Sequence, residues 1–358
     1  MIDDLASQNN LRALFDWIQI QLFINEPLDT IIHNVLGIPS DYFFLKQGKL
    51  EHYDYDHVVE YGAIRIYFDS SEQKLDCMLV MSGEALEFYR TEVLGKMKLT
   101  VKDFLLNLFQ VYENQFRITR VDPAIDDWNT IPYFTPQQLM KICRKKRFIY
   151  GKSTYFDVYG LETKEKGMTV YLKPPSADDR LKFYDKQAEQ AKKQGVRKKD
   201  IPPWIRTEIV FRREKAHEFV RHYLALDIEL IDLVKGYLKA KVKFYTDDEF
   251  KTPLRAWVKF LGKSRPFSLS IPKTKSGLVK KFDWYFHHGA IAVYHAYLFC
   301  IENHLLSHDE RMVYEEKEVL FPPDLASELQ KRATQYGRTE LVEPIVERTK
   351  KATSRTGD

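Results

Sequence analysis

Cysteine is scarce in this sequence, and the few cysteines lie far apart. The chain of 358 residues contains three of them, Cys77, Cys143 and Cys300. An odd set with such wide spacing provides neither a disulfide framework nor the paired thiols of a structural zinc site. The cysteine content is therefore typical of a protein from a reducing compartment.

Three other kinds of segment are missing. No stretch approaches the ~20 consecutive apolar residues of a membrane span. Residues 1–6 are acidic and lack the apolar core of a signal peptide. There is also no Gly-rich loop that ends in Lys and Ser or Thr, the motif that binds nucleotide phosphates. We therefore expect a cytoplasmic protein that contacts no membrane and has no phosphate loop for ATP.

A large excess of either charge is absent as well. The net charge is +4, from 55 basic and 51 acidic residues, so the balance alone does not identify a nucleic-acid partner. The basic residues cluster at 144–147, 192–199 and 263–281, and the last segment contains no acidic residue. Such runs are usually solvated faces, but in a chain with 14% aromatic residues they also suit a phosphate backbone.

Periodicity and turn residues predict an α+β fold, with a largely antiparallel sheet flanked by helices. Strands are expected at residues 15–23, 58–68, 75–81, 116–127, 147–158, 167–172, from 180 onward, and 204–212. Helices are expected at residues 28–36, 85–89, 101–112, 136–145, 187–194, 214–238, 253–261, 284–304 and 325–336. A strand followed by helices and hairpins occurs before residue 127 and again after it, which suggests a duplicated architecture. Pro123 cannot donate to a sheet ladder and so predicts an edge or a bulge in its strand.

The strand that begins at Arg180 carries a tyrosine between cations. Alternation places Leu181 and Phe183 on one side of it. The opposite side carries Arg180, Lys182, Tyr184 and Lys186. A tyrosine in this setting could attack a phosphodiester while the lysines hold the phosphate. The alternative is an ordinary strand tyrosine with solvated neighbours.

Two further strands carry carboxylates among arginines. In residues 116–127 and 204–212, alternation groups these charged residues on one face of each strand: Arg120, Asp122 and Asp126 on the first, and Arg206, Glu208 and Arg212 on the second. Carboxylate oxygens are ligands that Mg²⁺ and Mn²⁺ prefer. Asp126 and Asp127 are explained equally well by a strand-end turn or a helix cap. Glu208 could instead form a salt bridge to Arg206 or Arg212.

Six segments stand in a characteristic order. They are residues 15–19 (Phe-Asp-Trp-Ile-Gln), 81–84 (Met-Ser-Gly-Glu), 119–127 (Thr-Arg-Val-Asp-Pro-Ala-Ile-Asp-Asp), 154–156 (Thr-Tyr-Phe), 184–186 (Tyr-Asp-Lys) with Glu189, and 204–208 (Trp-Ile-Arg-Thr-Glu). In this order they resemble the Rep_trans replication initiation factors, over residues 11–240. The sequence departs from the family pattern at Pro123, where an aliphatic residue is expected, and at Asp157, where glycine is expected.

The resemblance implies a nicking enzyme that initiates rolling-circle replication of a plasmid. Tyr184 would cut one strand of the double-strand origin, stay joined to the 5′ phosphate and later rejoin the strand, in a topoisomerase-like strand transfer. Lys182 and Lys186 would hold the phosphate, and Arg120 and Arg206 would be further DNA contacts.

A phenol, with a reference pKa of about 10, is a poor nucleophile at neutral pH, so help from a metal is expected. The candidate ligands for Mg²⁺ or Mn²⁺ are Asp122, Glu208, Asp126 and Asp127. The His-apolar-His pair of many other rolling-circle enzymes is absent, because His287 and His288 are adjacent. Tyr155 is the rival nucleophile, but no cation flanks it.

The resemblance also implies partners: a homodimer, origin DNA with an extruded hairpin, and a helicase of the PcrA type. Two alternatives stay open, a relaxase of an integrative or conjugative element and a DNA-binding regulator without chemistry. Phe15 and Trp17 are expected in the core rather than as platforms for bases.

We expect a catalytic domain over residues 1–245, a helical, basic DNA-recognition region over 246–350 and a disordered tail over 351–358. Origin recognition is assigned to residues 263–281. The basic residues of this segment have no acidic partner within it: Lys263, Arg265, Lys273, Lys275, Lys280 and Lys281. A solvated linker is the alternative interpretation.

Overall fold

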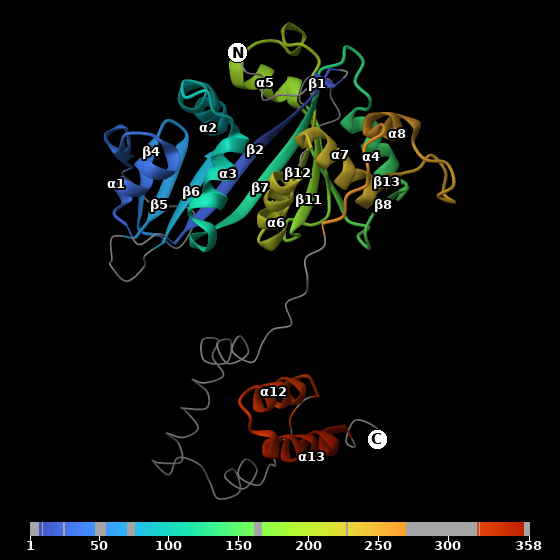
Figure 1. Cartoon of the computed structure of the whole chain (residues 1–358). Helices are drawn as coiled ribbons and strands as arrows, with labels where there is room; N and C mark the ends of the chain where they lie inside the picture. The colour runs from blue at the N-terminus through green and yellow to red at the C-terminus, as the bar shows by residue number, and fades with distance from the viewer. Residues whose placement is uncertain are drawn as a thin grey trace, which may run out of the picture. The chain divides into compact units, whose positions relative to one another are not determined.

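One antiparallel sheet organises the first part of the chain (Figure 1). The computed structural model describes residues 7–8, 10–23, 26–46, 55–69, 76–160, 167–226, 228–269, 321 and 323–353. Within them the sheet has eleven strands in the order β3 (Phe44–Leu45), β4 (His57–Tyr61), β5 (Ile64–Phe68), β6 (Cys77–Ser82), β2 (Leu11–Leu22), β7 (Phe116–Asp127), β12 (Ile205–Arg212), β11 (Asp179–Asp185), β10 (Thr169–Leu172) and β9 (Phe156–Tyr159), with β1 (Ser7–Gln8) beside β2. All its pairings are antiparallel, which confirms the predicted fold class.

The strand order is symmetric about the pair β2 and β7. After β2 the chain forms β3, β4, β5 and β6, and β6 returns to the side of β2. After β7 it forms β9, β10, β11 and β12, and β12 returns to the side of β7 in the same way. Two halves of equal connectivity therefore meet at the centre of the sheet. This repetition matches the duplicated architecture that the sequence suggests.

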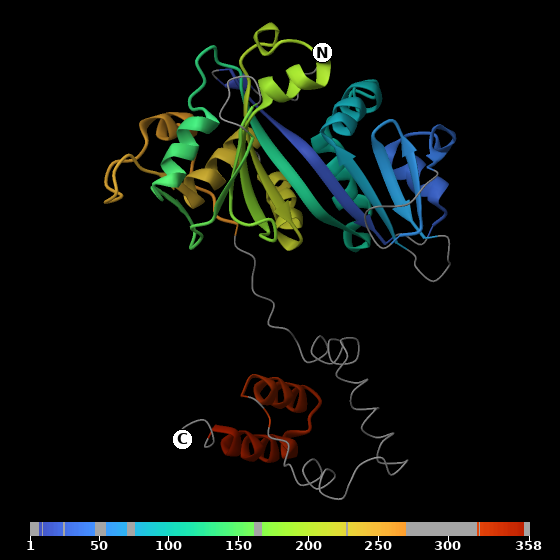
Figure 2. The same cartoon turned by 180° about the vertical axis from the view of Figure 1, so that it is seen from behind.

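Helices cover one face of this sheet. In Figure 1, α3 (Val101–Val111) and α6 (Glu214–Ala225) lie in front of the strands, and α6 and α7 (Leu230–Lys241) pack on β7. α4 (Pro136–Arg144) packs on β10 and β11, and Trp257 of α8 (Arg255–Leu261) contacts Phe183 of β11. The main apolar core lies between these helices and the sheet. In Figure 2, seen from behind, β2 and β7 are in the foreground.

Local sequence fixes several element ends as expected. α3 and α4 begin with capping boxes, in which Thr100 pairs with Asp103 and Thr135 with Gln138. α1 (Leu28–Ile31) continues as a π-helical turn, Ile32–Leu36, and ends at Gly37 in the left-handed conformation. α2 (Gly83–Phe88) begins after Ser82, whose side chain makes no capping hydrogen bond.

Three expected elements differ in the structure. Residues 58–68 form the hairpin of β4 and β5 rather than one strand, because Gly62 turns the chain at a φ of 60°. The strand expected at 147–158 is two strands: β8 (Phe148–Tyr150) pairs with β13 (Val242–Phe244), and β9 pairs with β10. The helix expected at 214–238 is two helices, α6 and α7.

Pro123 does not lie at an edge, since β7 runs between β2 and β12. The bulge is present, but on the neighbouring strand. Phe15 pairs with Pro123 and Ile18 with Val121, so two residues of β2 lie opposite one residue of β7.

The chain forms two compact units, Met1–Ile271 and Pro272–Asp358. The first unit includes α8 and thus extends past the expected boundary at residue 245. In the second unit, α12 (Pro323–Gln335) confirms the helix expected at 325–336, and α13 (Val342–Thr353) follows it. The helix expected at 284–304 lies outside the described residues. No helix in the described ranges is long and apolar enough to cross a membrane.

Candidate active site

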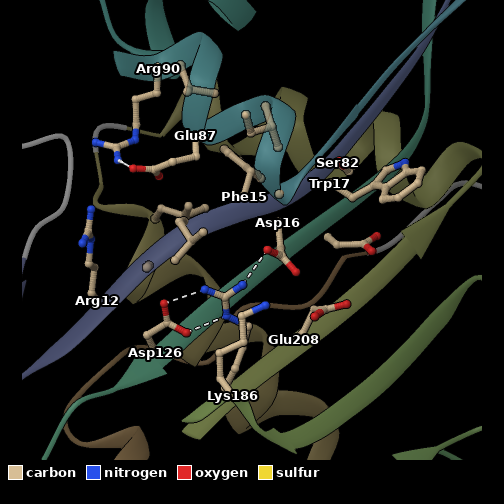
Figure 3. A pocket seen from close by; sticks show the side chains of 18 of the residues that line it. Arg12, Phe15, Asp16, Trp17, Ser82, Glu87, Arg90, Asp126, Lys186 and Glu208 are labelled. Carbon is tan, nitrogen blue, oxygen red and sulfur yellow. Dashed lines mark hydrogen bonds and ion pairs between the residues drawn. The ribbon is translucent and has the colours of Figure 1, made fainter. Parts of the chain in front are cut away.

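A cavity of about 1140 Å³ is lined by residues of the central strands β2, β7, β11 and β12 (Figure 3). Residues of α2 and of α5 (Lys186–Gln194) line it as well, and so do residues near the ends of α3, α6 and α7 on the helix-covered side. Its charged and aromatic lining includes Asp16, Trp17, Arg120, Asp122, Asp126, Lys182, Tyr184, Lys186, Trp204, Arg206 and Glu208. Sheet pairing thus brings together most of the predicted catalytic and metal-binding residues, although the first of them, Asp122, and the last, Glu208, are 86 positions apart in the sequence.

Tyr184 lies near the end of β11, directly opposite Arg206 of β12. The next residue, Asp185, caps α5 by accepting a hydrogen bond from the Ala188 amide, so strand and helix join at a fixed point. Tyr184 is only 3% exposed. Burial, together with the charge of Glu208, raises the pKa of the phenol well above its usual value. The phenol therefore stays protonated at neutral pH unless a further cation acts on it.

Two lysines flank the tyrosine ring, as the alternation predicts. The Lys182 ammonium lies 4.3 Å from the centre of the Tyr184 ring, and the Lys186 ammonium lies 5.4 Å from it. Lys186 also forms an ion pair with Glu189 one helical turn later. The tyrosine is thus held between two cations of one strand face and its following helix.

Glu208 forms a salt bridge to Lys182, not to Arg206 or Arg212. Both carboxylate oxygens of Glu208 lie 3.2 Å from the Lys182 ammonium, across the β11–β12 pair. Glu208 is 2% exposed, and burial raises the pKa of its carboxyl although Lys182 opposes the shift. A buried carboxylate with one ammonium partner still has oxygen lone pairs for a second cation.

Asp122 is the second deeply buried carboxyl of the cavity, at 2% exposure. The guanidinium of Arg120 binds it through Nε, 2.9 Å from Oδ1, and through Nη2, 2.5 Å from Oδ2. Burial nevertheless raises the pKa of Asp122 to about 7, with the charge of Glu208 contributing and Arg120 opposing. Ionisation of Asp122 or of Glu208 therefore costs free energy at these buried positions.

Arg206 joins three strands through ion pairs to Asp16 and Asp126, and dashed lines in Figure 3 mark these pairs at the two labelled aspartates. Its Nε and Nη2 donate to the two oxygens of Asp126 on β7, at 2.6 and 2.7 Å. Its Nη1 donates to Asp16 of β2 at 2.5 Å. Asp126 is therefore a bidentate partner of an arginine that is itself almost fully buried, at 4% exposure.

Sequence reasoning missed Asp16 as a site residue. Asp16 and Trp17 are the two bulge residues of β2, so both face the cavity although they are neighbours in sequence. The signal was present: the apolar residues of this strand lie at 11, 13 and 15 and then at 18, 20 and 22, and such a shift of phase indicates a bulge.

Gly83, the first residue of α2, contacts Asp16 closely. A Cβ at this position would lie 2.4 Å from Oδ1 of Asp16. A side chain at position 83 would therefore displace the Asp16 carboxylate from the place where it pairs with Arg206.

The aromatic residues divide between the two faces. Phe15 is buried in the main core, as expected. Trp17 instead lies on the cavity face, where it packs on a small apolar cluster and its ring lies 4.3 Å from the Arg120 guanidinium. Trp204 stacks on Trp128 with ring centres 4.0 Å apart, also beside the cavity.

Two predicted residues are not brought to the cavity. Asp127 points away from Asp126, and its oxygens accept hydrogen bonds from Asn129, through its backbone and side-chain amides, and from the Tyr133 amide. This is the strand-end turn that was its alternative interpretation. Tyr155 precedes β9 at the far edge of the sheet and is 40% exposed.

The basic segment at 263–281 is described only as far as residue 269. Its start packs on α7, where Ser264 donates to Asp232 and the Phe267 amide donates to the Gly236 carbonyl. Lys263 and Arg265 are exposed in this part of the chain and do not line the cavity. Lys273, Lys275, Lys280 and Lys281 lie outside the described residues.

Asp16, Asp122 and Glu208 offer only oxygen atoms as ligands, which is the ligand type that a hard cation such as Mg²⁺ prefers. Their positions do not form a complete metal site. Each carboxylate has a basic partner, and the described residues contain no group of three or more His, Cys, Asp or Glu side chains placed to hold a metal.

Two family models match the chain. Residues 116–294 match the Rep_trans model, described as a replication initiation factor, and residues 12–107 match the N-terminal domain of rolling-circle replication initiation proteins. The first match alone covers half of the chain. The protein belongs to the Rep_trans family of replication initiation factors. The resemblance read from the six sequence segments is thereby confirmed.

Two individual proteins are similar over most of this Rep_trans chain. The "Putative DNA relaxase NicK" of Bacillus subtilis (strain 168) is 27% identical over 291 residues, which cover 78% of this chain and 79% of the relaxase. The structure of a rolling-circle replication initiator protein from Geobacillus stearothermophilus aligns with a TM-score of 0.56 and 24% identity, over 73% of this chain and 98% of that one. Membership in a family of initiators and relaxases implies a DNA-nicking enzyme.

Proposed function

We propose that this protein initiates rolling-circle replication by nicking one strand of a double-strand origin with Tyr184. The phenol oxygen would attack the scissile phosphorus, the bond to the 3′ oxygen would break, and the phenol proton would end on that 3′ oxygen. The product is a 5′-phosphotyrosine link and a free 3′ hydroxyl for synthesis. The reverse reaction would rejoin the strand, because the link retains the energy of the phosphodiester.

One observation carries this proposal. Tyr184 is the tyrosine that the fold places inside the cavity against two lysines and a buried glutamate. Lys182 and Lys186 would bind oxygens of the scissile phosphate. Glu208 is the carboxylate whose charge acts most on the pKa of Tyr184, so a cation bound at Glu208 would make the phenol easier to ionise.

We further propose that Mg²⁺ or Mn²⁺ assists the reaction, held by Asp122 and Glu208. A divalent cation would polarise the phosphate and stabilise the charge that develops on it. The raised pKa values of both carboxyls support the assignment, since a bound cation offsets the cost of ionising them. Asp126 is a weaker candidate because its arginine partner, Arg206, is 4% exposed and also paired with Asp16, whereas Arg120, the partner of Asp122, is 27% exposed and can turn away more easily.

The test is nicking of a supercoiled plasmid that carries its own origin, with and without Mg²⁺. We expect relaxed product and a protein–DNA adduct that survives boiling in detergent, and peptide mass spectrometry should place the adduct on Tyr184. Tyr184→Phe should abolish both and retain DNA binding, whereas Tyr155→Phe, the matched control, should cut normally. An adduct on Tyr155 would overturn the assignment. A protein that binds the origin without any adduct would instead be a regulator without chemistry.

A second candidate function shares this chemistry. The similarity to a DNA relaxase favours a relaxase of an integrative or conjugative element. The two functions differ in the DNA that is cut, so a plasmid carrying a transfer origin, compared with one carrying a replication origin, separates them. A homodimer and a helicase of the PcrA type are further predictions, for which mass photometry and an unwinding assay on nicked plasmid are direct tests.

A further inference from the structure

A group of arginines continues the cavity face toward the other end of its strands. Arg120 of β7 lies directly opposite Arg212 of β12. Arg180 of β11 pairs with Val210, so it lies diagonal to Arg212 on the same face. Opposed residues of a sheet have Cβ atoms ~5 Å apart, and diagonal ones are ~7–8 Å apart. Arg120 lines the cavity, and Arg180 and Arg212 lie beyond its lining.

Arg180 and Arg212 form hydrogen bonds to backbone carbonyls, whereas Arg120 forms an ion pair with the carboxylate of Asp122. Nη1 of Arg212 donates to the carbonyls of Pro175 and Ala177, at 2.7 and 3.3 Å. Nε of Arg180 donates to the carbonyl of Lys173 at 3.1 Å. Carbonyl oxygens orient a guanidinium but do not neutralise it. Nη2 of Arg180 is buried and has no hydrogen-bond partner in the described part of the chain.

The cluster is electrostatically unfavourable when the protein is alone. Like charges directly opposite each other destabilise a sheet. Burial lowers the pKa of Arg212, and the charges of Arg120 and Arg180 lower it further. Asp122 offsets part of this repulsion, but it is already the bidentate partner of Arg120. An anion bound between Arg180 and Arg212 would therefore reduce the electrostatic repulsion among the three arginines.

The donors are also held in place before any ligand arrives. The Arg180 guanidinium lies 3.8 Å from the centre of the Tyr171 ring, in addition to its carbonyl contact. Stacked and hydrogen-bonded guanidiniums lose little freedom on binding, and their forked donors match the oxygens of a phosphate.

We propose that Arg180 and Arg212, together with Arg120, form a second phosphate subsite that binds the DNA backbone beside the scissile phosphate. The inference rests on the proposed nicking function, since it places the scissile phosphate at Tyr184. Tyr184 and Arg180 are four residues apart on one strand, which is a span of ~13 Å. The arginines therefore contact a neighbouring phosphate of the same strand, and they set the direction in which that strand crosses the sheet.

The salt dependence of binding tests this subsite without any cutting. In a Tyr184→Phe protein, binding to a labelled oligo(dT) strand is measured by fluorescence anisotropy over a series of KCl concentrations. Each phosphate contact on single-stranded DNA contributes about 0.7 to the slope of log K against log salt. We expect Arg180→Gln and Arg212→Gln each to lower the slope by about 0.7, and the double variant by about 1.4.

Two sets of variants keep the test specific. Arg180→Lys and Arg212→Lys retain the charge, so they should preserve the slope while weakening the affinity through loss of the forked donors. Arg221→Gln is the matched control, because it removes the same charge from α6 on the helix-covered face, where Arg221 pairs with Glu218. Its slope should equal that of the parent.

The subsite is refuted if the Arg180→Gln, Arg212→Gln double variant keeps the parental slope while its melting temperature shows that it is folded. A parent protein that does not bind oligo(dT) also counts against the subsite. Adduct formation by the unmodified tyrosine protein is measured separately on supercoiled plasmid. If the salt slope falls in the arginine variants but no adduct forms, the nicking function is refuted and the subsite is retained. If an adduct forms but the salt slope of the arginine variants is unchanged, the subsite is refuted and the nicking function is retained.

Discussion

Replacing Arg206 by glutamine should destabilise the first unit by about 3–5 kcal/mol, the cost typical of leaving one member of a buried ion pair alone. The Arg206 side chain is 4% exposed and joins Asp126 and Asp16. Asp126 is 2% exposed, so without Arg206 it becomes an uncompensated buried carboxylate. Asp16 is 18% exposed and can be hydrated, so most of the loss arises at Asp126. In a unit of this size 1 kcal/mol corresponds to about 2–4 °C, so the melting temperature should fall by about 6–20 °C.

The assay is thermal unfolding of the whole chain, followed by tryptophan fluorescence. The deciding variant is the double substitution Arg206→Gln with Asp126→Asn, which removes the stranded charge as well. It should recover part of the stability lost in Arg206→Gln, with a coupling of about 1–3 kcal/mol. Arg221→Gln is the control for removal of a guanidinium, because its exposed pair with Glu218 is of a kind that contributes little.

Two results would refute this reasoning. One is an Arg206→Gln protein that melts within about 2 °C of the parent, below the shift expected even for 1 kcal/mol in a large domain. The other is strict additivity of Arg206→Gln and Asp126→Asn, since residues that share an ion pair should not behave independently.

Further predictions concern other groups of the cavity and the basic segment. In EDTA, the folded state should bind one more proton than the unfolded state at Asp122, between the unfolded pKa of about 4 and the folded pKa of about 7. The free energy of unfolding should therefore fall as pH rises through this window. Asp122→Asn should flatten the profile of melting temperature against pH. Glu208→Gln should slow nicking more than it weakens DNA binding, and a wild-type rate across a Mg²⁺ titration would exclude a metal role for this residue. Gly83→Ala should lower the melting temperature, because its Cβ would lie 2.4 Å from Oδ1 of Asp16, and a smaller effect is expected in an Asp16→Ala background. A swap of residues 263–281 with a relative that serves a different origin should transfer origin preference, and a chimera that keeps its original preference in a binding competition would move recognition elsewhere, first to residues 144–147.

Much of the fold follows from local patterns. Periodicity and the helix-start residues Thr100 and Thr135 place α3 and α4 within one residue, and alternation fixes which side of β11 carries Tyr184 and the lysines. The partners of those side chains do not follow, because they depend on which strands are neighbours. Glu208 is paired with Lys182 because β12 lies beside β11, and the residue spacing within either strand does not predict which strands are neighbours.

Asp16 and Arg180 illustrate what single-strand reasoning omits. Asp16 follows Phe15 of the core and so faces the cavity by alternation, but its pairing with Arg206 depends on which strands are neighbours, and the bulge adds Trp17 to the same face. Arg180 stands on the same face as Tyr184, but its crowding with Arg120 and Arg212 depends on the register of three strands. Asp127 is the opposite case, since its position beside Asp126 suggested a shared site and the strand period separates them.

The proposed chemistry lies on one side of the centre of this symmetric sheet. β6 and β12 occupy equivalent places beside β2 and β7, yet the faces that they turn away from the main core differ. On the first half, Met78 and Val80 of β6 join Tyr67 of β5 in a small apolar cluster, and Trp17 packs against it. On the second half, the equivalent strands β11 and β12 carry Tyr184 and Glu208. The first half therefore acts as a support, whose apolar cluster and β2 bulge hold Trp17 and Asp16 against the charged residues of the second half.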